Sequence, residues 1–114
     1  MNAVLIYVTA PNRDEAVRIG RTVVTEGLAA CANILDGMTS IFRWHGEVQQ
    51  ESEAVLLLKT RAELALQVVQ RVQELHSYDV PAILVLPIVA GSTLFMSWID
   101  EETAEMAEKQ LSGE

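Results

Sequence analysis

A hairpin of unusual length constrains the fold of this chain more than any other feature of its sequence. Two β-rich segments, 28–44 and 47–59, are joined by the turn residues His45 and Gly46, and the pair Asp36-Gly37 predicts a kink or bulge in the first arm. Each arm has well over ten residues, whereas an average strand has about five or six. An isolated two-stranded ribbon is marginally stable in water, so we expect the outer half to lie against a neighbouring subunit.

Strands and helices alternate on either side of this hairpin. The resulting order is β-α-β-β-α-β followed by C-terminal helical sequence, which is the ferredoxin-like split βαβ pattern of an α+β fold. We expect one domain over residues 1–114, with both main helices on one face of an antiparallel sheet. Besides the hairpin, the segments that carry this pattern are strands at 3–9 and 82–89, helices at 12–27 and 60–75, and one or two helical pieces at 94–110.

Capping-box spacing marks the starts of the first two helices. Asn12 is followed three residues later by Glu15, and Thr60 is followed at the same distance by Glu63. Pro87 cannot donate to a neighbouring strand, so it predicts an edge position or a bulge for the last strand.

The strands are more apolar than one core requires. A sheet with one face in water alternates apolar and polar residues, but the runs 3–9, 54–59 and 82–89 do not alternate. Half of the residues are hydrophobic, and one short C-terminal helix is too small to cover a second sheet face. The pattern therefore predicts association between the sheets of several protomers, in a homo-oligomer.

Charge and targeting signals exclude several classes of partner. The chain has 8 Lys and Arg against 16 Asp and Glu, and its net charge of −8 opposes binding to nucleic acid. It has no apolar run of about eighteen residues to span a membrane. Residues 1–8 lack the basic and cleavage regions of a secretory signal, so we expect no membrane association and a cytoplasmic location.

The two histidines and the single cysteine are the residues to weigh for metal or redox chemistry. Cys31 is predicted to be a small buried hydrophobic residue, because no base or positive charge adjoins it in sequence. His45 is expected in a solvated turn. His76 ends a helix, where it meets the helix dipole or serves as a ligand for copper or zinc. Neither histidine has a second one at i+3 or i+4, so any metal site needs ligands from distant segments.

Other charged and aromatic residues have simpler interpretations. Lys59 is either a charge at a strand end or a cation in a cleft between subunits. The tryptophans are expected to be packing anchors. P-loop, GxGxxG, HExxH and GxSxG motifs are absent from the sequence, which predicts no catalytic residues and no required cofactor. We expect a solvated edge of the sheet to carry three glutamates, Glu47, Glu51 and Glu53.

Several segments, in order along the chain, resemble the CutA family of divalent-cation-tolerance proteins. This resemblance implies a non-enzymatic ferredoxin-like protomer in a homotrimer whose long hairpins wrap neighbouring subunits. It also implies a role in tolerance of divalent cations such as copper. The alternative is a module like the PII signalling proteins, with a small molecule bound between subunits. The segments are 8–11 (VTAP), 28–34 (LAACANI), 39–44 (TSIFRW) with Gly46, 74–81 (ELHSYDVP) with 86–88 (LPI), and 98–99 (WI).

Carried over residue by residue, the resemblance gives one metal ligand and one group of cleft residues. His76 matches a histidine of the family, but Leu75 and Val8 stand where copper-binding members have histidine and cysteine, and Ser77 replaces a proline. We therefore expect only weak binding of copper or another divalent cation, at His76. The residues expected to line a cleft between subunits are Cys31, Asn33, Trp44, Lys59, Tyr78 and Trp98.

Overall fold

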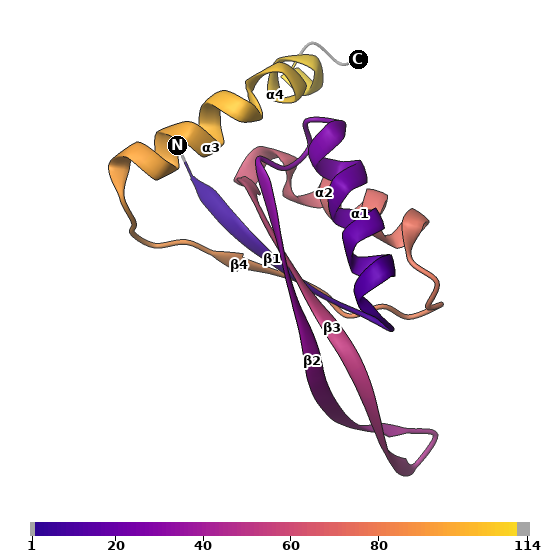
Figure 1. Cartoon of the computed structure of the whole chain (residues 1–114). Coiled ribbons are helices and arrows are strands. Elements are labelled where there is room, and N and C mark those ends of the chain that lie inside the picture. The colour runs from indigo at the N-terminus through magenta and orange to yellow at the C-terminus, as the bar shows by residue number, and fades with distance from the viewer. Residues whose placement is uncertain (1, 112–114) are drawn as a thin grey trace.

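The computed structural model describes residues 2–111 and contains a four-stranded antiparallel sheet in the order β2-β3-β1-β4 (Figure 1). β1 (Ala3–Ala10) lies between β3 (Glu47–Arg61) and β4 (Ile83–Pro87), and β2 (Cys31–Trp44) pairs with β3. This is the ferredoxin-like α+β arrangement that the order of elements predicts. β4 is an edge strand, as Pro87 indicates.

Helices lie on both faces of the sheet, but unequally. α1 (Arg13–Thr25) and α2 (Ala65–Leu75) pack side by side on one face (Figure 1). A short 3-10 turn, η1 (Ala62–Leu64), precedes α2. The C-terminal sequence forms two pieces, α3 (Thr93–Glu102) and α4 (Ala104–Leu111), and α3 contacts β1 and β3. No helix within residues 2–111 is long and apolar enough to cross a bilayer.

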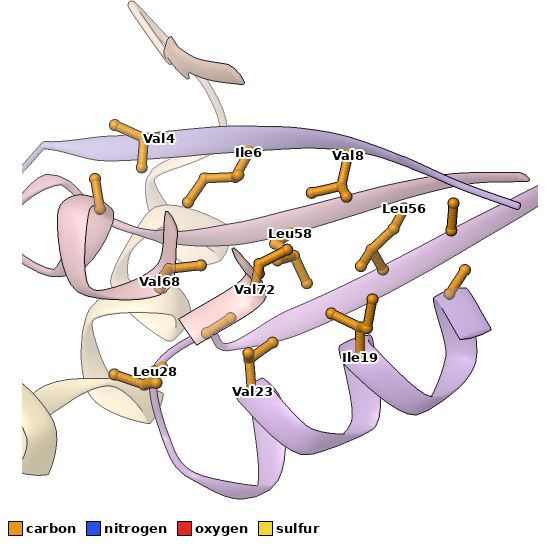
Figure 2. Close-up of a cluster of buried hydrophobic side chains, with 14 of the residues drawn as sticks. Val4, Ile6, Val8, Ile19, Val23, Leu28, Leu56, Leu58, Val68 and Val72 are labelled. Carbon is orange, nitrogen blue, oxygen red and sulfur yellow. The ribbon is translucent and has the colours of Figure 1, made fainter. Parts of the chain in front are cut away.

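The hydrophobic core fills the space between the sheet and the α1–α2 layer. Alternate residues of β1 and β3 point into it and meet one apolar stripe from each helix (Figure 2). Full burial of each Leu, Ile or Val contributes about 1.5–3 kcal/mol, so this layer is the main source of stability. Its central side chains are Val4, Ile6, Val8, Ile19, Val23, Leu28, Leu56, Leu58, Val68 and Val72.

The opposite face, which we call the open face, is only partly covered. α3 buries Ile99 completely against Ala3 and Ala30 at one end of the sheet. Further along, Leu35 is 59% exposed and Leu84 is 58% exposed. One short helix therefore does not cover this face within a single chain, as the unbroken apolar strands predict.

The hairpin of β2 and β3 extends well beyond the rest of the sheet (Figure 1). Its strands have 14 and 15 residues, and the last residue of β1 pairs with Ala54, so residues 38–53 have no third strand beside them. The turn places His45 and Gly46 at positive φ, 51° and 81°. Several large apolar side chains at this outer end are exposed, namely Ile41, Phe42, Trp44 and Val48.

One of the two predicted helix caps is wrong. Asn12 caps α1 as expected, because its side-chain oxygen accepts a hydrogen bond from the backbone N–H of Glu15 at 2.8 Å. Thr60, by contrast, lies inside β3 and is buried, and its hydroxyl donates to the Leu28 carbonyl at 2.7 Å. β3 continues past Lys59 because Thr60 pairs with Val4 of β1, and α2 begins only at Ala65.

Candidate functional site

The structure divides the predicted site residues among three places. Cys31, Asn33 and Lys59 meet on the open face, and Trp98 of α3 lies beside this group through its contact with Phe95. Tyr78 belongs to a second group, where the loop after α2 meets the end of β1. Trp44 is at the outer end of the hairpin, thirteen residues along β2 from Cys31.

The first group, named the Lys59 cluster, consists of Cys31, Asn33, Lys59 and Phe95. Cys31 is directly opposite Lys59 in the β2–β3 ladder. Asn33 is two residues further along β2, so its side chain is on the same face of the sheet. The Lys59 Nζ donates a hydrogen bond to Asn33 Oδ1 at 2.7 Å and lies 5.4 Å from the centroid of the Phe95 ring. The Cys31 thiol donates to the same amide oxygen at 3.6 Å. Cys31 is half-buried rather than fully buried.

The two tryptophans have different surroundings. Trp98 stacks at a tilt on Phe95, with ring centroids 5.5 Å apart, which links it to the Lys59 cluster. Trp44 contacts the ring of His45 edge to face at 4.9 Å. A single chain does not bring Trp44 or Tyr78 near Lys59, so a cleft shared by all six predicted residues stays a prediction about an assembly.

The second group, named the His76 cluster, consists of Glu15, Glu53, His76, Ser77 and Tyr78. The His76 side chain is completely buried. Its Nε2 donates to the Thr9 carbonyl at 2.7 Å, and its Nδ1 accepts from the Tyr78 backbone N–H at 3.1 Å. This pair of contacts fits the neutral ring with its proton on Nε2. Because both ring nitrogens already have partners, a metal ion at His76 would have to displace one of these hydrogen bonds.

Two carboxylates that no sequence motif marks as site residues complete the His76 cluster. Glu15 Oε2 lies 3.4 Å from His76 Nδ1 and accepts hydrogen bonds from the backbone N–H and hydroxyl of Ser77, both at 2.9 Å. Glu53 accepts a hydrogen bond from the Tyr78 hydroxyl at 3.0 Å. The expectation of a solvated Glu53 is wrong, because this side chain is buried beneath Tyr78.

The environment of Tyr78 disfavours its phenolate form. Partial burial of the ring is the main cause, and the hydrogen bond to Glu53 and the negative charge of that carboxylate add to it. Together they raise the pKa of Tyr78 from 10.0 to about 12. Tyr78 is therefore a stable hydrogen-bond donor at neutral pH and is poorly suited to act as a general base.

Among residues 2–111, the two clusters differ from a nucleophile–base pair and from a metal site with three or more ligands. The hydrogen-bond partner of the Cys31 thiol is a neutral amide, so the Lys59 cluster offers the thiol no general base. Within residues 2–111, no three or more His, Cys, Asp or Glu residues come together as a metal site. A surface cavity of about 320 Å³ beside the His76 cluster has carboxylates in its lining, from Asp14, Asp36 and Glu53.

Comparisons with known proteins identify the family. Residues 4–102 match the family described as CutA1 divalent ion tolerance protein. The divalent-cation tolerance protein CutA of Thermus thermophilus is 41% identical over 99 residues, which are 87% of this chain and 96% of that protein. The chloroplastic CutA protein of Arabidopsis thaliana is 40% identical over 101 residues, and there the matched region spans 89% of this chain but only 56% of the relative.

Solved structures agree with the sequence comparisons. The Cut A1 structure from Thermus thermophilus gives a TM-score of 0.86 at 40% identity and covers 89% of this chain and 98% of that one. The CutA structure from Xylella fastidiosa gives a TM-score of 0.88 at 33% identity, with coverages of 90% and 99%. The sequence match and the shared fold each extend over most of the chain, which therefore belongs to the CutA1 divalent ion tolerance protein family.

Proposed function

We propose that this protein contributes to tolerance of divalent cations by binding them weakly and reversibly, without catalysing a reaction. The observation that carries the proposal is the family match over residues 4–102, whose description names an ion tolerance and no reaction. The net charge of −8 supports it, because an excess of carboxylates raises the local concentration of cations around the molecule.

The same proposal assigns copper binding to His76, with Glu15 as the second ligand. Imidazole nitrogen is a good copper ligand, and the Glu15 carboxylate lies 3.4 Å from Nδ1. The metal would replace the Tyr78 N–H as the partner of Nδ1, and the Ser77 hydrogen bonds to Glu15 would weaken. Two ligands and these lost hydrogen bonds together make the affinity low.

Calorimetric titration with copper(II) tests this assignment. We expect weak binding to the wild type and at least about tenfold weaker binding to His76→Ala and Glu15→Gln, because each variant removes one ligand. His45→Ala is the matched control, since His45 is exposed in the hairpin turn and should leave the affinity unchanged. Wild-type affinity in His76→Ala would show that copper binds elsewhere, and loss of binding in His45→Ala would move the site to the hairpin.

We also propose that the protein is a homotrimer. The support is the exposed apolar surface on the open face and at the outer end of the hairpin, including Leu35, Leu84 and Trp44. Light scattering coupled to size exclusion should give about three times 12.6 kDa. Leu84→Glu should shift the protein toward smaller species, whereas Leu66→Glu, on the outer surface of α2, should not. A folded wild-type monomer would contradict the proposal.

A cytoplasmic location belongs to the same proposal. The names of relatives specify different compartments: the Arabidopsis protein is called chloroplastic, and the Archaeoglobus fulgidus structure is called periplasmic. Fractionation of cells that express the natural gene, followed by antibody detection, should find the protein in the cytoplasmic fraction. Detection in a periplasmic or organelle fraction would contradict the proposal.

A further inference from the structure

We propose that the Lys59 cluster binds the carboxylate of a small organic acid whose apolar body lies on the open face of the sheet. This inference goes beyond cation tolerance, because it assigns an anionic ligand to a different part of the molecule. It rests on the charge, the free hydrogen-bond donors and the surroundings of Lys59.

The charge of Lys59 is not balanced within the described chain. Among residues 2–111, carboxylates pair with Arg61, Arg71 and Lys109, but none lies within ion-pair distance of Lys59. Its closest polar partner is the neutral amide oxygen of Asn33. Four exposed arginines also have no ion pair, but among the Lys and Arg residues of this part of the chain Lys59 is the one that is half-buried without a carboxylate.

The hydrogen-bond donors of the cluster exceed its acceptors. Asn33 Oδ1 accepts from both Lys59 and Cys31, so it holds the ammonium and the thiol on one side of the amide. The Asn33 Nδ2 group has no hydrogen-bond partner among residues 2–111, and the ammonium has two further N–H groups to offer. A carboxylate has acceptors only, and it can take hydrogen bonds from both groups at once.

The surroundings of Lys59 favour an apolar ligand body. Leu5 is directly opposite Lys59 in the β1–β3 ladder, and Leu86 is opposite Leu5 in the next ladder, on the same face. Phe95 and Trp98 border the same area from α3, and both are exposed in the single chain. With one lysine and no arginine in the cluster, a single carboxylate matches the charge better than a phosphate group does.

A trimer that covers the open face would strengthen the need for an anion. Burial of an ammonium without a compensating charge is strongly unfavourable, so contact with another subunit would leave Lys59 in need of a negative partner. A small carboxylate compensates the charge and also uses the donors of Asn33. The competing source of negative charge is a glutamate or aspartate from another copy, and the experiment separates the two.

The test uses the whole chain and three probes: benzoate, the neutral benzamide of nearly the same shape, and inorganic phosphate. Backbone amide shifts of the isotope-labelled wild type, followed by NMR, should respond to benzoate at residues 31, 33, 59 and 95. Benzamide and phosphate should give much smaller responses. The affinity for benzoate should fall about tenfold or more in Lys59→Met, which removes a charge-assisted hydrogen bond but retains the aliphatic stem.

Two further variants make the test specific. Asn33→Ala should also weaken benzoate binding, because it removes the second donor. Lys109→Met is the matched control, since it deletes one positive charge on α4, where Lys109 faces Glu105, and should leave the affinity unchanged. The wild-type shift map needs no variant, so it remains decisive if Lys59→Met does not fold.

Three results would overturn the proposal. The first is no response of the wild type to benzoate, which would show that the Lys59 cluster does not bind a small carboxylate. The second is equal binding of benzoate and benzamide, which would show that the site does not distinguish a charged ligand from a neutral one. The third is a shift map centred outside the Lys59 cluster. None of these results bears on copper binding at His76, which is measured separately.

Discussion

The Tyr78 hydroxyl donates a hydrogen bond to Glu53 Oε2 at 3.0 Å and so ties the loop after α2 to β3. The same loop is held from the other side by His76, whose Nδ1 accepts the Tyr78 backbone N–H. A carboxylate 25 residues away in the sequence and the proposed copper ligand itself thus fix the residues that lead into β4.

Tyr78→Phe should destabilise the protein more than Tyr7→Phe does. The first substitution leaves the buried Glu53 carboxylate without its donor, which lowers the free energy of unfolding by about 1–3 kcal/mol. In the control, the Tyr7 hydroxyl contacts only the Met38 sulfur at 3.7 Å, a weak acceptor. Urea denaturation of both variants measures the difference, and equal losses would contradict the role given to Glu53.

Alkaline pH should weaken the fold through Tyr78. Its pKa is raised from 10.0 to about 12 in the folded state. Between these values the unfolded chain releases the phenolic proton while the folded chain keeps it, so stability falls as pH rises. The contribution is fully present below pH 10. Ultraviolet titration of tyrosinate should show one of the two tyrosines ionising near pH 12, and Tyr78→Phe should remove that step.

Gly20→Val should overpack the contact between α1 and the hairpin. A Cβ at Gly20 would lie 3.0 Å from Ala32 Cβ and 3.1 Å from Leu56 Cδ1, so additional methyl groups force the helix away from the sheet. We expect a loss of about 1–3 kcal/mol in the free energy of unfolding. Arg21→Val introduces the same side chain at the next, exposed position of α1 and should cost about 0.5 kcal/mol. Similar thermal stability of both variants would refute this packing argument.

Arg61→Met should loosen α3 and α4. The Arg61 guanidinium is largely buried; it pairs with Asp100 Oδ1 at 2.6 Å, donates to the Asp100 carbonyl, and donates to Thr103 Oγ1 at 2.9 Å. Its loss should cost about 2–3 kcal/mol and speed amide exchange in residues 93–111. Arg71→Met removes exposed ion pairs with Glu26 and Glu74 and should cost much less, because water screens charges at the surface. Unchanged exchange in α3 would contradict this account.

The order of elements was predictable from the sequence because it depends on local patterns. Apolar periodicity and the turn at His45 and Gly46 are properties of short segments, and the structure has the strands and helices they indicate. The failed cap at Thr60 shows the limit of such patterns. A threonine with a glutamate three residues later fits a helix start, but pairing with Val4 keeps Thr60 in the sheet.

The composition of the sites was harder to predict, because it depends on register and on long-range contacts. Near the turn, Trp44 pairs with Glu47, and counting back from that pair would set Cys31 opposite Thr60. The shift between Leu35 and Met38 changes this partner to Lys59. A bulge at Asp36-Gly37 was expected, but its one-residue effect on pairing was not. The His76 cluster combines α1, β3 and the loop after α2, which no local pattern connects.

The central place of β1 in the sheet has a consequence for synthesis on the ribosome. β1 leaves the ribosome before its partners, since Ala3 pairs with Arg61 and Val4 pairs with Pro87, 58 and 83 positions later in the chain. The hairpin, whose arms are neighbours in sequence, has no such delay and is able to form as soon as its turn is made. Nascent β1 therefore has two unpaired edges until β3 is made, and one unpaired edge until β4 follows. During this interval the apolar strand is exposed to aggregation, which is the risk that this topology carries.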